Sequence, residues 1–175
     1  MKESHRLGLL ASIVQMLNEA DSWTGRMHIQ KLVYFAQRLL GLQSSYEFVL
    51  YQRGPYSFDL DADIRSLRSV GAAEIRPSPP PYGPKYLRTG LGEAISKLSP
   101  VEEGLNEMLI ALAKELGPKT ASELELLATT HYALHEDDES DKDILNRVVS
   151  LKPQFTPDQV KEALGQVRQL EGRFG

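Results

Sequence analysis

Apolar residues recur at helical spacing just after position 25, and this segment organises the predicted fold. They lie three and four positions apart at Ile29, Leu32, Val33, Ala36, Leu39 and Leu40. This spacing places them on one face of an amphipathic helix over 26–40. Thr24 is the expected N-cap of this helix. Gly41 follows it, where a left-handed residue commonly ends a helix.

A short strand and a second helix are predicted to follow. Tyr46–Tyr51 is rich in aromatic and branched residues, which is typical of a strand. Because Pro55 has no N–H to donate and Gly54 tolerates positive φ, we expect the strand to end before this Gly-Pro turn. Helical spacing then resumes with Leu60, Ile64, Leu67 and Val70. It predicts a helix over 57–70, which Gly71 would end.

The same criteria place four further elements in the first half of the chain. They are a helix over 4–19, short strands over 73–76 and 85–89, and a helix over 91–98. Prolines crowd the segment 77–84, which excludes helix and central strand there and makes it the tip of a hairpin. Helices followed by a hairpin are typical of a winged-helix domain, which we place at residues 1–98.

The rest of the chain, 99–175, is predicted to be a helical subdomain packed on the first. Capping-box patterns occur at Ser99 with Glu102, Thr120 with Glu123 and Thr156 with Gln159. The expected helices cover 99–116, 120–135, 141–151 and 156–172. The fold class is therefore mostly α with a minor β component: a winged-helix-like domain with a small β-hairpin, extended by a C-terminal helical bundle.

Composition narrows the classes of protein. The 175 residues are 41% hydrophobic and 25% charged, as in ordinary soluble domains, and include no cysteine. Disulfides, cysteine metal sites and thiol catalysis are thereby excluded. No apolar run approaches the ~20 residues of a membrane span, and the charged start does not resemble a signal peptide. We expect a cytoplasmic protein that does not engage membranes.

The net charge of −4 conceals an asymmetry between the two halves. Residues 1–98 carry 12 Lys and Arg against 9 Asp and Glu, whereas residues 99–175 carry 8 against 15. A strongly acidic back half argues against extensive wrapping of nucleic acid. It favours a basic protein partner, such as a toxin with a basic active site.

The helix over 57–70 carries acidic groups where a DNA-reading helix would present its first residues to the bases. Aspartates there would lie near phosphates and raise the free-energy cost of docking, so a protein surface is the preferred destination of this face. The partner-binding residues predicted on this basis are Arg53, Tyr56, Asp59, Asp61 and Asp63. We expect the aromatic residues around the central strand to be mainly core, with a part exposed beside Arg53, because Tyr and Arg are frequent in interaction hot spots.

An alternative function is that of a winged-helix transcription regulator. Its DNA-binding residues would be Arg65, Arg68, Arg76, Lys85 and Arg88, with Tyr82 at the hairpin tip available for stacking. For the tip we prefer a solvated loop stiffened by prolines, because the three cations Arg76, Lys85 and Arg88 are few for a phosphate-binding surface.

Two histidines have the four-residue spacing of metal ligands on a helix. Between His131 and His135 there is no glutamate to act as general base, although Glu136 or Asp138 would add a ligand. We therefore assign them structural roles and expect neither metal nor cofactor; a metal-dependent hydrolase remains a third possibility. The sequence contains neither a G-x-S-x-G nucleophile motif nor a phosphate-binding glycine loop, so an enzyme is not expected.

Two motifs in the central region carry a family resemblance. They are His28-Ile29-Gln30-Lys31-Leu32-Val33-Tyr34-Phe35 and Tyr51-Gln52-Arg53-Gly54-Pro55-Tyr56-Ser57 with Leu60. This pair resembles the YwgA-like and SocA-like (Panacea) group of bacterial proteins, and is similar to the toxin-binding C-terminal domain of DarG-type antitoxins. The resemblance is strongest over residues 26–70. It implies a winged-helix-like domain with extra helices that acts as an antitoxin by occluding a partner toxin.

Overall fold

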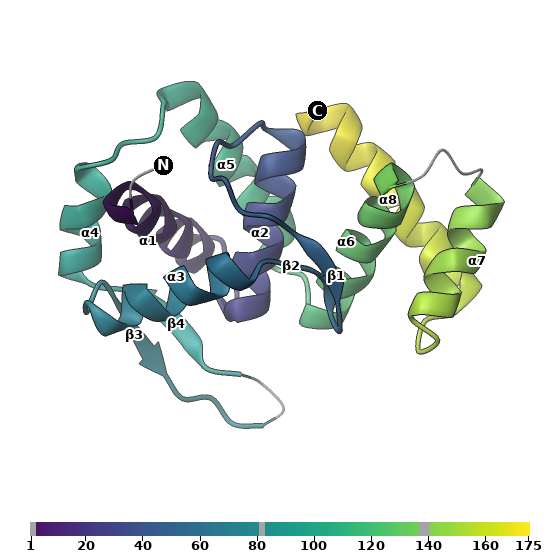
Figure 1. Cartoon of the computed structure of the whole chain (residues 1–175), viewed down its shortest axis with the longest axis horizontal. Helices are drawn as coiled ribbons and strands as arrows, with labels where there is room; N and C mark the ends of the chain where they lie inside the picture. Colours follow the sequence, from purple (N-terminus) through teal and green to yellow (C-terminus); the bar gives the residue numbers. More distant parts are fainter. Residues whose placement is uncertain (1–2, 81–82, 137–140) are drawn as a thin grey trace.

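The protein is described by a computed structural model that covers residues 3–80, 83–136 and 141–175. Figure 1 shows a mostly helical molecule with short β-hairpins, which confirms the predicted class of mostly α with a minor β component. In chain order the elements are α1 (Glu3–Glu19), α2 (Arg26–Leu39), β1 (Val49–Tyr51), β2 (Gly54–Tyr56), α3 (Phe58–Ser69), β3 (Ala73–Arg76), β4 (Lys85–Arg88), α4 (Gly90–Lys97), α5 (Glu103–Leu116), α6 (Ala121–Glu136), α7 (Asp141–Leu151) and α8 (Pro157–Phe174).

Helix α2 forms where its apolar stripe predicted it, but its start differs from the prediction. Thr24 has φ +49 and is fully buried, with its hydroxyl bonded to Asn18 and to the Ser22 carbonyl. A capping residue needs extended backbone to direct its side chain at the helix, so Thr24 is wrong as the N-cap. Gly25 takes that place, without a side-chain bond.

The first strand ends at Tyr51, before the Gly-Pro segment, as predicted, but Gly54 and Pro55 belong to the second strand of a hairpin and not to its turn. β1 is shorter than predicted, and β2 pairs with it antiparallel, with Tyr51 opposite Gly54 and Leu50 opposite Pro55. Both strands of a two-stranded sheet are edge strands, where proline is tolerated because its missing N–H can face away from the partner. The two-residue turn between the strands consists of Gln52 and Arg53.

The next elements follow the sequence pattern closely. Ser57 caps α3 by accepting a hydrogen bond from the Leu60 N–H, and Gly71, at φ +78, follows the end of the helix. β3 and β4 pair antiparallel from Ala73 opposite Arg88 to Arg76 opposite Lys85. The hairpin they form extends away from the helical body (Figure 1). Residues 81 and 82 of its tip lie outside the described chain.

In the second half two of the three predicted caps are confirmed. Thr120 and Thr156 each accept a hydrogen bond from the N–H three residues on, with the matching Glu123 and Gln159 bonds present. The cap at Ser99 is wrong, because α5 begins only at Glu103. The Ser99 N–H bonds back to the Ser96 carbonyl, so Ser99 continues the turn that ends α4.

The main hydrophobic core spans both halves of the chain. It includes Leu10, Ile29 and Leu60 from the first half with Leu109 and Leu127 from the second, all nearly or fully buried. The boundary at position 98 stays a prediction. A smaller core lies among α6, α7 and α8 and includes Leu126, Ala133, Ile144, Val148, Phe155, Val160 and Ala163. Over the described residues, no helix combines the length and apolar character of a membrane span.

Candidate functional site

Helix α2 holds the Gly-Pro hairpin by its backbone. The Gln30 side chain makes two hydrogen bonds to Ser57, donating to its carbonyl at 2.9 Å and accepting from its N–H at 3.0 Å. The next residue, Lys31, donates from Nζ to the Pro55 carbonyl at 2.6 Å. Both side chains are fully buried. The two motifs, whose bonded residues are 27 and 24 positions apart in sequence, are therefore one packed unit.

The second half of the chain holds the same hairpin from the other side. Lys152, between α7 and α8, donates to the Gln52 carbonyl in the turn and forms an ion pair with Glu125 at 2.8 Å. Gly54 has no room for a side chain, because a Cβ would lie 2.7 Å from the Thr129 hydroxyl of α6. Close approach of α6 thus requires glycine at this position.

Burial changes the chemistry of Lys31. Loss of solvation lowers its pKa to about 7, while the charges of Glu125 and Lys152 act in opposite directions. Lysines with such values serve as nucleophiles in some enzymes. The side chain of Lys31 is, however, fully enclosed and bonded to a backbone carbonyl. Its geometry is that of a structural anchor.

Three aromatic side chains lie together on the outer face of this hairpin, and we call them the aromatic cluster: Tyr51 of β1, Tyr56 of β2 and Phe58 at the start of α3. Their ring centroids are 5.2–5.6 Å apart in all three pairs. Tyr51 is 47% exposed and Phe58 58% exposed. Large aromatic rings in tilted and edge-to-face contact at the surface form an apolar patch typical of a docking surface.

The predicted aromatic set therefore divides into two groups. Tyr34, Phe35 and Tyr46 are buried, as a core would require. Tyr51 and Phe58 face solvent beside the exposed Arg53. Alternation along β1 explains the exposure of Tyr51, because Val49 on the same face is also exposed whereas Leu50 is half-buried.

Asp61 does not belong to a free acidic surface, which corrects the prediction for this residue. It is only 4% exposed, and its carboxylate is paired with Arg26 at 3.1 Å and Arg65 at 2.6 Å. Tyr56 joins this group: burial, together with a hydrogen bond to Asp61, raises the pKa of its hydroxyl. The charge of Asp61 is used inside the protein, to join α3 to the start of α2.

Asp63 is likewise internal. It is 6% exposed, pairs with Arg6 of α1 at 2.6 Å and accepts a hydrogen bond from the Tyr46 hydroxyl at 2.8 Å. Burial and this bond raise the pKa of Tyr46. Of the three aspartates predicted to bind a partner, only Asp59 is exposed. Helical periodicity had placed all three on polar positions, but α1 and α2 cover the face that carries two of them.

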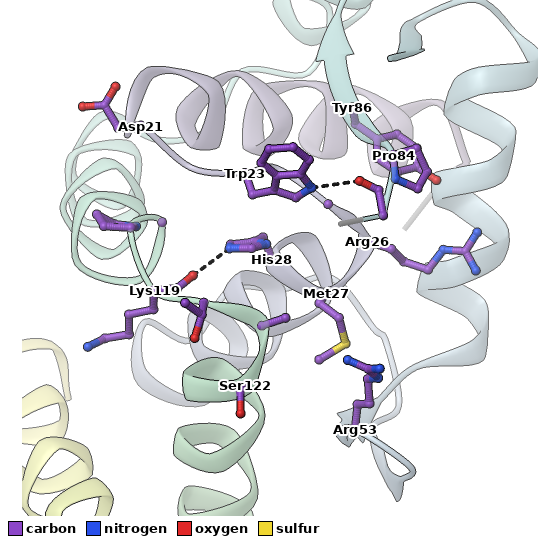
Figure 2. Close-up of a pocket in the computed structure, with 16 residues that line it drawn as sticks. Asp21, Trp23, Arg26, Met27, His28, Arg53, Pro84, Tyr86, Lys119 and Ser122 are labelled. Atoms are coloured by element: carbon purple, nitrogen blue, oxygen red, sulfur yellow. Dashed lines mark hydrogen bonds between the residues drawn. The ribbon is translucent and has the colours of Figure 1, made fainter. Parts of the chain in front are cut away.

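A pocket of about 790 Å³ opens beside Arg53 (Figure 2). Its wall includes Trp23, whose indole N–H donates to the Gly83 carbonyl at 2.9 Å. His28 lies 2.9 Å from the Lys119 carbonyl through Nε2, and burial lowers its pKa. Because a carbonyl only accepts, Nε2 carries the proton of a neutral imidazole. Arg26 and Arg53 also line this pocket.

The cations predicted to bind DNA are dispersed and partly neutralised. Arg65 pairs with Asp61, and Arg76 pairs with Glu74 at 3.2 Å. Arg88 donates to the Ser96 hydroxyl at 3.4 Å. Arg68 is exposed and Lys85 is half-buried on β4. Tyr82, the proposed stacking residue, lies outside the described residues.

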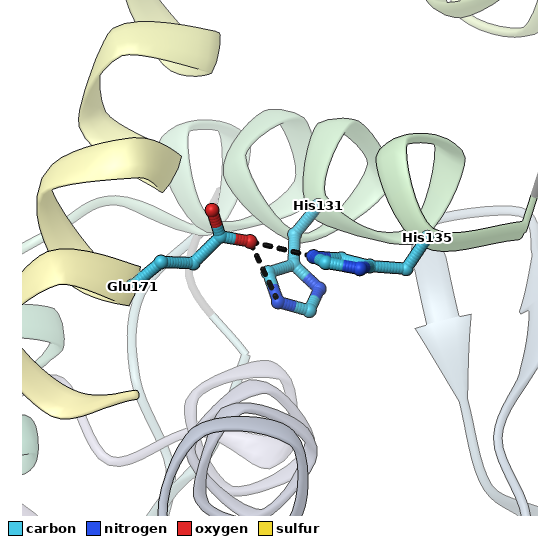
Figure 3. A group of neighbouring side chains, drawn as sticks. All are labelled: His131, His135 and Glu171. Atoms are coloured by element: carbon cyan, nitrogen blue, oxygen red, sulfur yellow. Dashed lines mark hydrogen bonds and ion pairs between the residues drawn. The ribbon is translucent and has the colours of Figure 1, made fainter. Parts of the chain in front are cut away.

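The two histidines of α6 lie beside the carboxylate of Glu171, which their spacing in the sequence did not indicate. His131, His135 and Glu171 of α8 converge, with Glu171 Oε1 3.7 Å from His131 Nε2 and 2.5 Å from His135 Nε2 (Figure 3). Burial lowers the pKa of His131 to about 3, so its imidazole is neutral. Asp138, one ligand considered from the sequence, lies outside the described residues.

Neither a family model nor a curated protein matches this chain. The resemblance to the YwgA-like and SocA-like group therefore stays a prediction.

Proposed function

We propose that this protein is a non-enzymatic protein-binding module of the bacterial antitoxin type, which occludes a partner protein through its aromatic cluster. The observation that carries the proposal is the mutual contact of Tyr51, Tyr56 and Phe58 on an exposed hairpin. Aromatic side chains of this kind dominate the binding free energy of many interfaces.

The construction of the hairpin supports a docking role. Lys31 and Gln30 fix its backbone from the side of α2, and Lys152 fixes its turn from the C-terminal half. An anchored hairpin loses little conformational entropy when a partner binds, so the aromatic cluster is preorganised. Burying polar side chains and exposing aromatic ones both cost folding free energy. A hairpin that combines the two is better explained if its exposed aromatic side chains bind a partner.

The charges around the aromatic cluster define the partner. Arg53 is exposed beside it, and within the described chain no carboxylate lies at ion-pair distance from it. Asp61 is internal, so Asp59 is the one exposed aspartate of α3. The partner surface should therefore combine an apolar patch with carboxylates opposite Arg53. This replaces the cationic partner that the aspartates had suggested for this face.

Co-expression with the product of the neighbouring gene tests the proposal, because antitoxins are usually encoded beside their toxins. We expect a stable complex that Phe58→Ala and Tyr51→Ala each weaken at least tenfold, as loss of a hot-spot aromatic does. Leu98→Ala is the matched control, because Leu98 is 79% exposed but lies at the end of α4. Thermal unfolding of each variant verifies its fold.

Two results would contradict this assignment. One is the absence of any complex with the neighbouring gene product. The other is a complex whose dissociation constant is the same for Phe58→Ala, Tyr51→Ala and Leu98→Ala. In a growth assay, a toxic partner should be neutralised by the parent protein and by Leu98→Ala but not by the aromatic variants.

DNA binding is the second candidate, and one observation favours it. The β3–β4 hairpin follows α3 and extends from the body beside it, the arrangement of a wing next to a recognition helix (Figure 1). Binding to the protein's own upstream DNA should then weaken steeply with salt, and Arg68→Ala and Lys85→Ala should each reduce the salt slope by about one. Salt-independent or absent binding would reject this function.

A further inference from the structure

We propose that His131, His135 and Glu171 form a binding site for a divalent first-row transition-metal ion, with Zn²⁺ as the natural probe. The three candidate ligand atoms lie within 4.8 Å of one another. Both imidazoles face the same carboxylate oxygen, at 3.7 Å and 2.5 Å. Two histidines and one carboxylate are a common ligand set for zinc and for its neighbours in the first row.

Two of the three distances between candidate ligand atoms are close to what an ion requires. Zinc bonds of about 2.0–2.1 Å at tetrahedral angles place neighbouring ligand atoms roughly 3.3 Å apart. The His131–Glu171 distance of 3.7 Å is near this value, and the His135–Glu171 pair must open by less than about 1 Å. His135 is half exposed, so its side chain can make that movement. Solvent can fill the remaining coordination position.

The surroundings of His131 prepare it as a ligand. Its Nδ1 atom is hydrogen-bonded to the Tyr34 hydroxyl at 2.8 Å, inside the core. When Nδ1 carries the proton and donates it to Tyr34, Nε2 keeps a lone pair directed at Glu171. Such an outer hydrogen bond orients most metal-binding histidines. Tyr34 also belongs to the α2 motif, so the site is connected to the helix that anchors the hairpin.

A metal at this position would connect α6 to α8. His131 and His135 project from one face of α6, and Glu171 projects from the last turns of α8 (Figure 3). The ion would hold the C-terminal helix on the second hydrophobic core and on the main core, to which α8 contributes Val167, Leu170 and Phe174. Because its three candidate ligands come from two packed helices, the expected role of the ion is structural.

Titration calorimetry and thermal unfolding with Zn²⁺, on protein made without an affinity tag, test the site. We expect one ion per chain, an increase in melting temperature on adding Zn²⁺, and at least a tenfold loss of affinity in His135→Ala and Glu171→Gln. Both residues are partly exposed, so these variants should fold. His5→Ala and Glu162→Gln are matched controls, because both residues are exposed and lie outside the site.

The outcomes are distinct. Loss of binding in the two ligand variants but not in the controls establishes the site. Absence of Zn²⁺ binding by the parent protein, or equal affinity in His135→Ala, Glu171→Gln and the controls, overturns it. The result is independent of the partner-binding proposal, which concerns Tyr51, Tyr56 and Phe58 of the aromatic cluster.

Discussion

Lys31 donates a hydrogen bond from Nζ to the carbonyl oxygen of Pro55 at 2.6 Å, inside the protein. This bond joins the central helix to the hairpin that carries the aromatic cluster. It also gives the fully buried Lys31 ammonium a hydrogen-bond partner, as buried polar groups require.

Replacing Lys31 by Met should lower the free energy of unfolding by about 1–3 kcal/mol, because a buried carbonyl loses its donor. Met keeps most of the volume, so cavity formation contributes little. Chemical denaturation at pH 10 measures the change, because the lowered pKa of Lys31 takes little stability from the parent protein at that pH. Lys97→Met is the control, because Lys97 is exposed and its pair with Glu93 lies within one helix turn; it should change stability by at most about 0.5 kcal/mol.

Stability should also rise with pH above neutrality, and Lys31 should be responsible. The pKa of Lys31 is about 7 in the folded protein, against an ordinary value of 10.5. Between these values the unfolded chain holds a proton that the folded protein has released, so the free energy of unfolding increases by up to about 1.4 kcal/mol per pH unit. Denaturation at pH 7, 8 and 9 should show this rise in the parent and not in Lys31→Met; equal slopes would contradict it.

Gly54→Ala should be far more damaging than Gly41→Ala, although both glycines have positive φ, at +78 and +66. A Cβ at position 41 meets nothing within 4 Å, whereas at position 54 it lies 2.7 Å from the Thr129 hydroxyl. The difference between the two variants isolates the steric term. We expect Gly41→Ala to lower the free energy of unfolding by about 1 kcal/mol. Gly54→Ala should lower it by roughly 1–3 kcal/mol more. Similar losses would show that α6 does not approach the hairpin so closely.

Asp61→Asn should destabilise the protein by about 1–3 kcal/mol, because its two arginine partners lose a buried carboxylate. Asp59→Asn, two positions earlier but exposed, should change stability by at most about 0.5 kcal/mol. Urea denaturation distinguishes them. Equal effects would mean that Asp61 is as solvent-exposed as its helical neighbour.

Ser99 and Thr156 have similar capping-box patterns in sequence, but only Thr156 caps a helix. Thr156→Ala should cost about 1 kcal/mol, because it removes the hydroxyl that caps α8. Ser99→Ala should be close to neutral, because α5 begins at Glu103 and Ser99 caps nothing. Thermal unfolding of the two variants provides the measurement, and a larger loss at Ser99 would place the start of α5 where the sequence pattern had it.

Sequence periodicity was sufficient for most elements of the fold. Apolar spacing located α2 and α3, and prolines located the tip of the β3–β4 hairpin, because these signals depend on neighbouring residues alone. Local sequence patterns gave wrong helix caps where contacts with other segments set the backbone conformation. Ser99 has the sequence pattern of a capping box, but its N–H bonds to the Ser96 carbonyl at the end of α4. Thr24 accepts a hydrogen bond from Asn18 and has a left-handed backbone conformation.

The functional surfaces depended most on tertiary structure. The sequence by itself showed two motifs, one with Gln30 and Lys31 and the other with Gly54 and Pro55. It also showed that tyrosines and arginines lie close to them along the chain. Only folding decided that the lysine binds the proline carbonyl and that Asp61 and Asp63 are enclosed by arginines from other helices. It also brought Glu171 to the histidine pair of α6. The physical reason is that periodicity records which side of a helix is polar, whereas burial of that side is decided by the segments that pack against it.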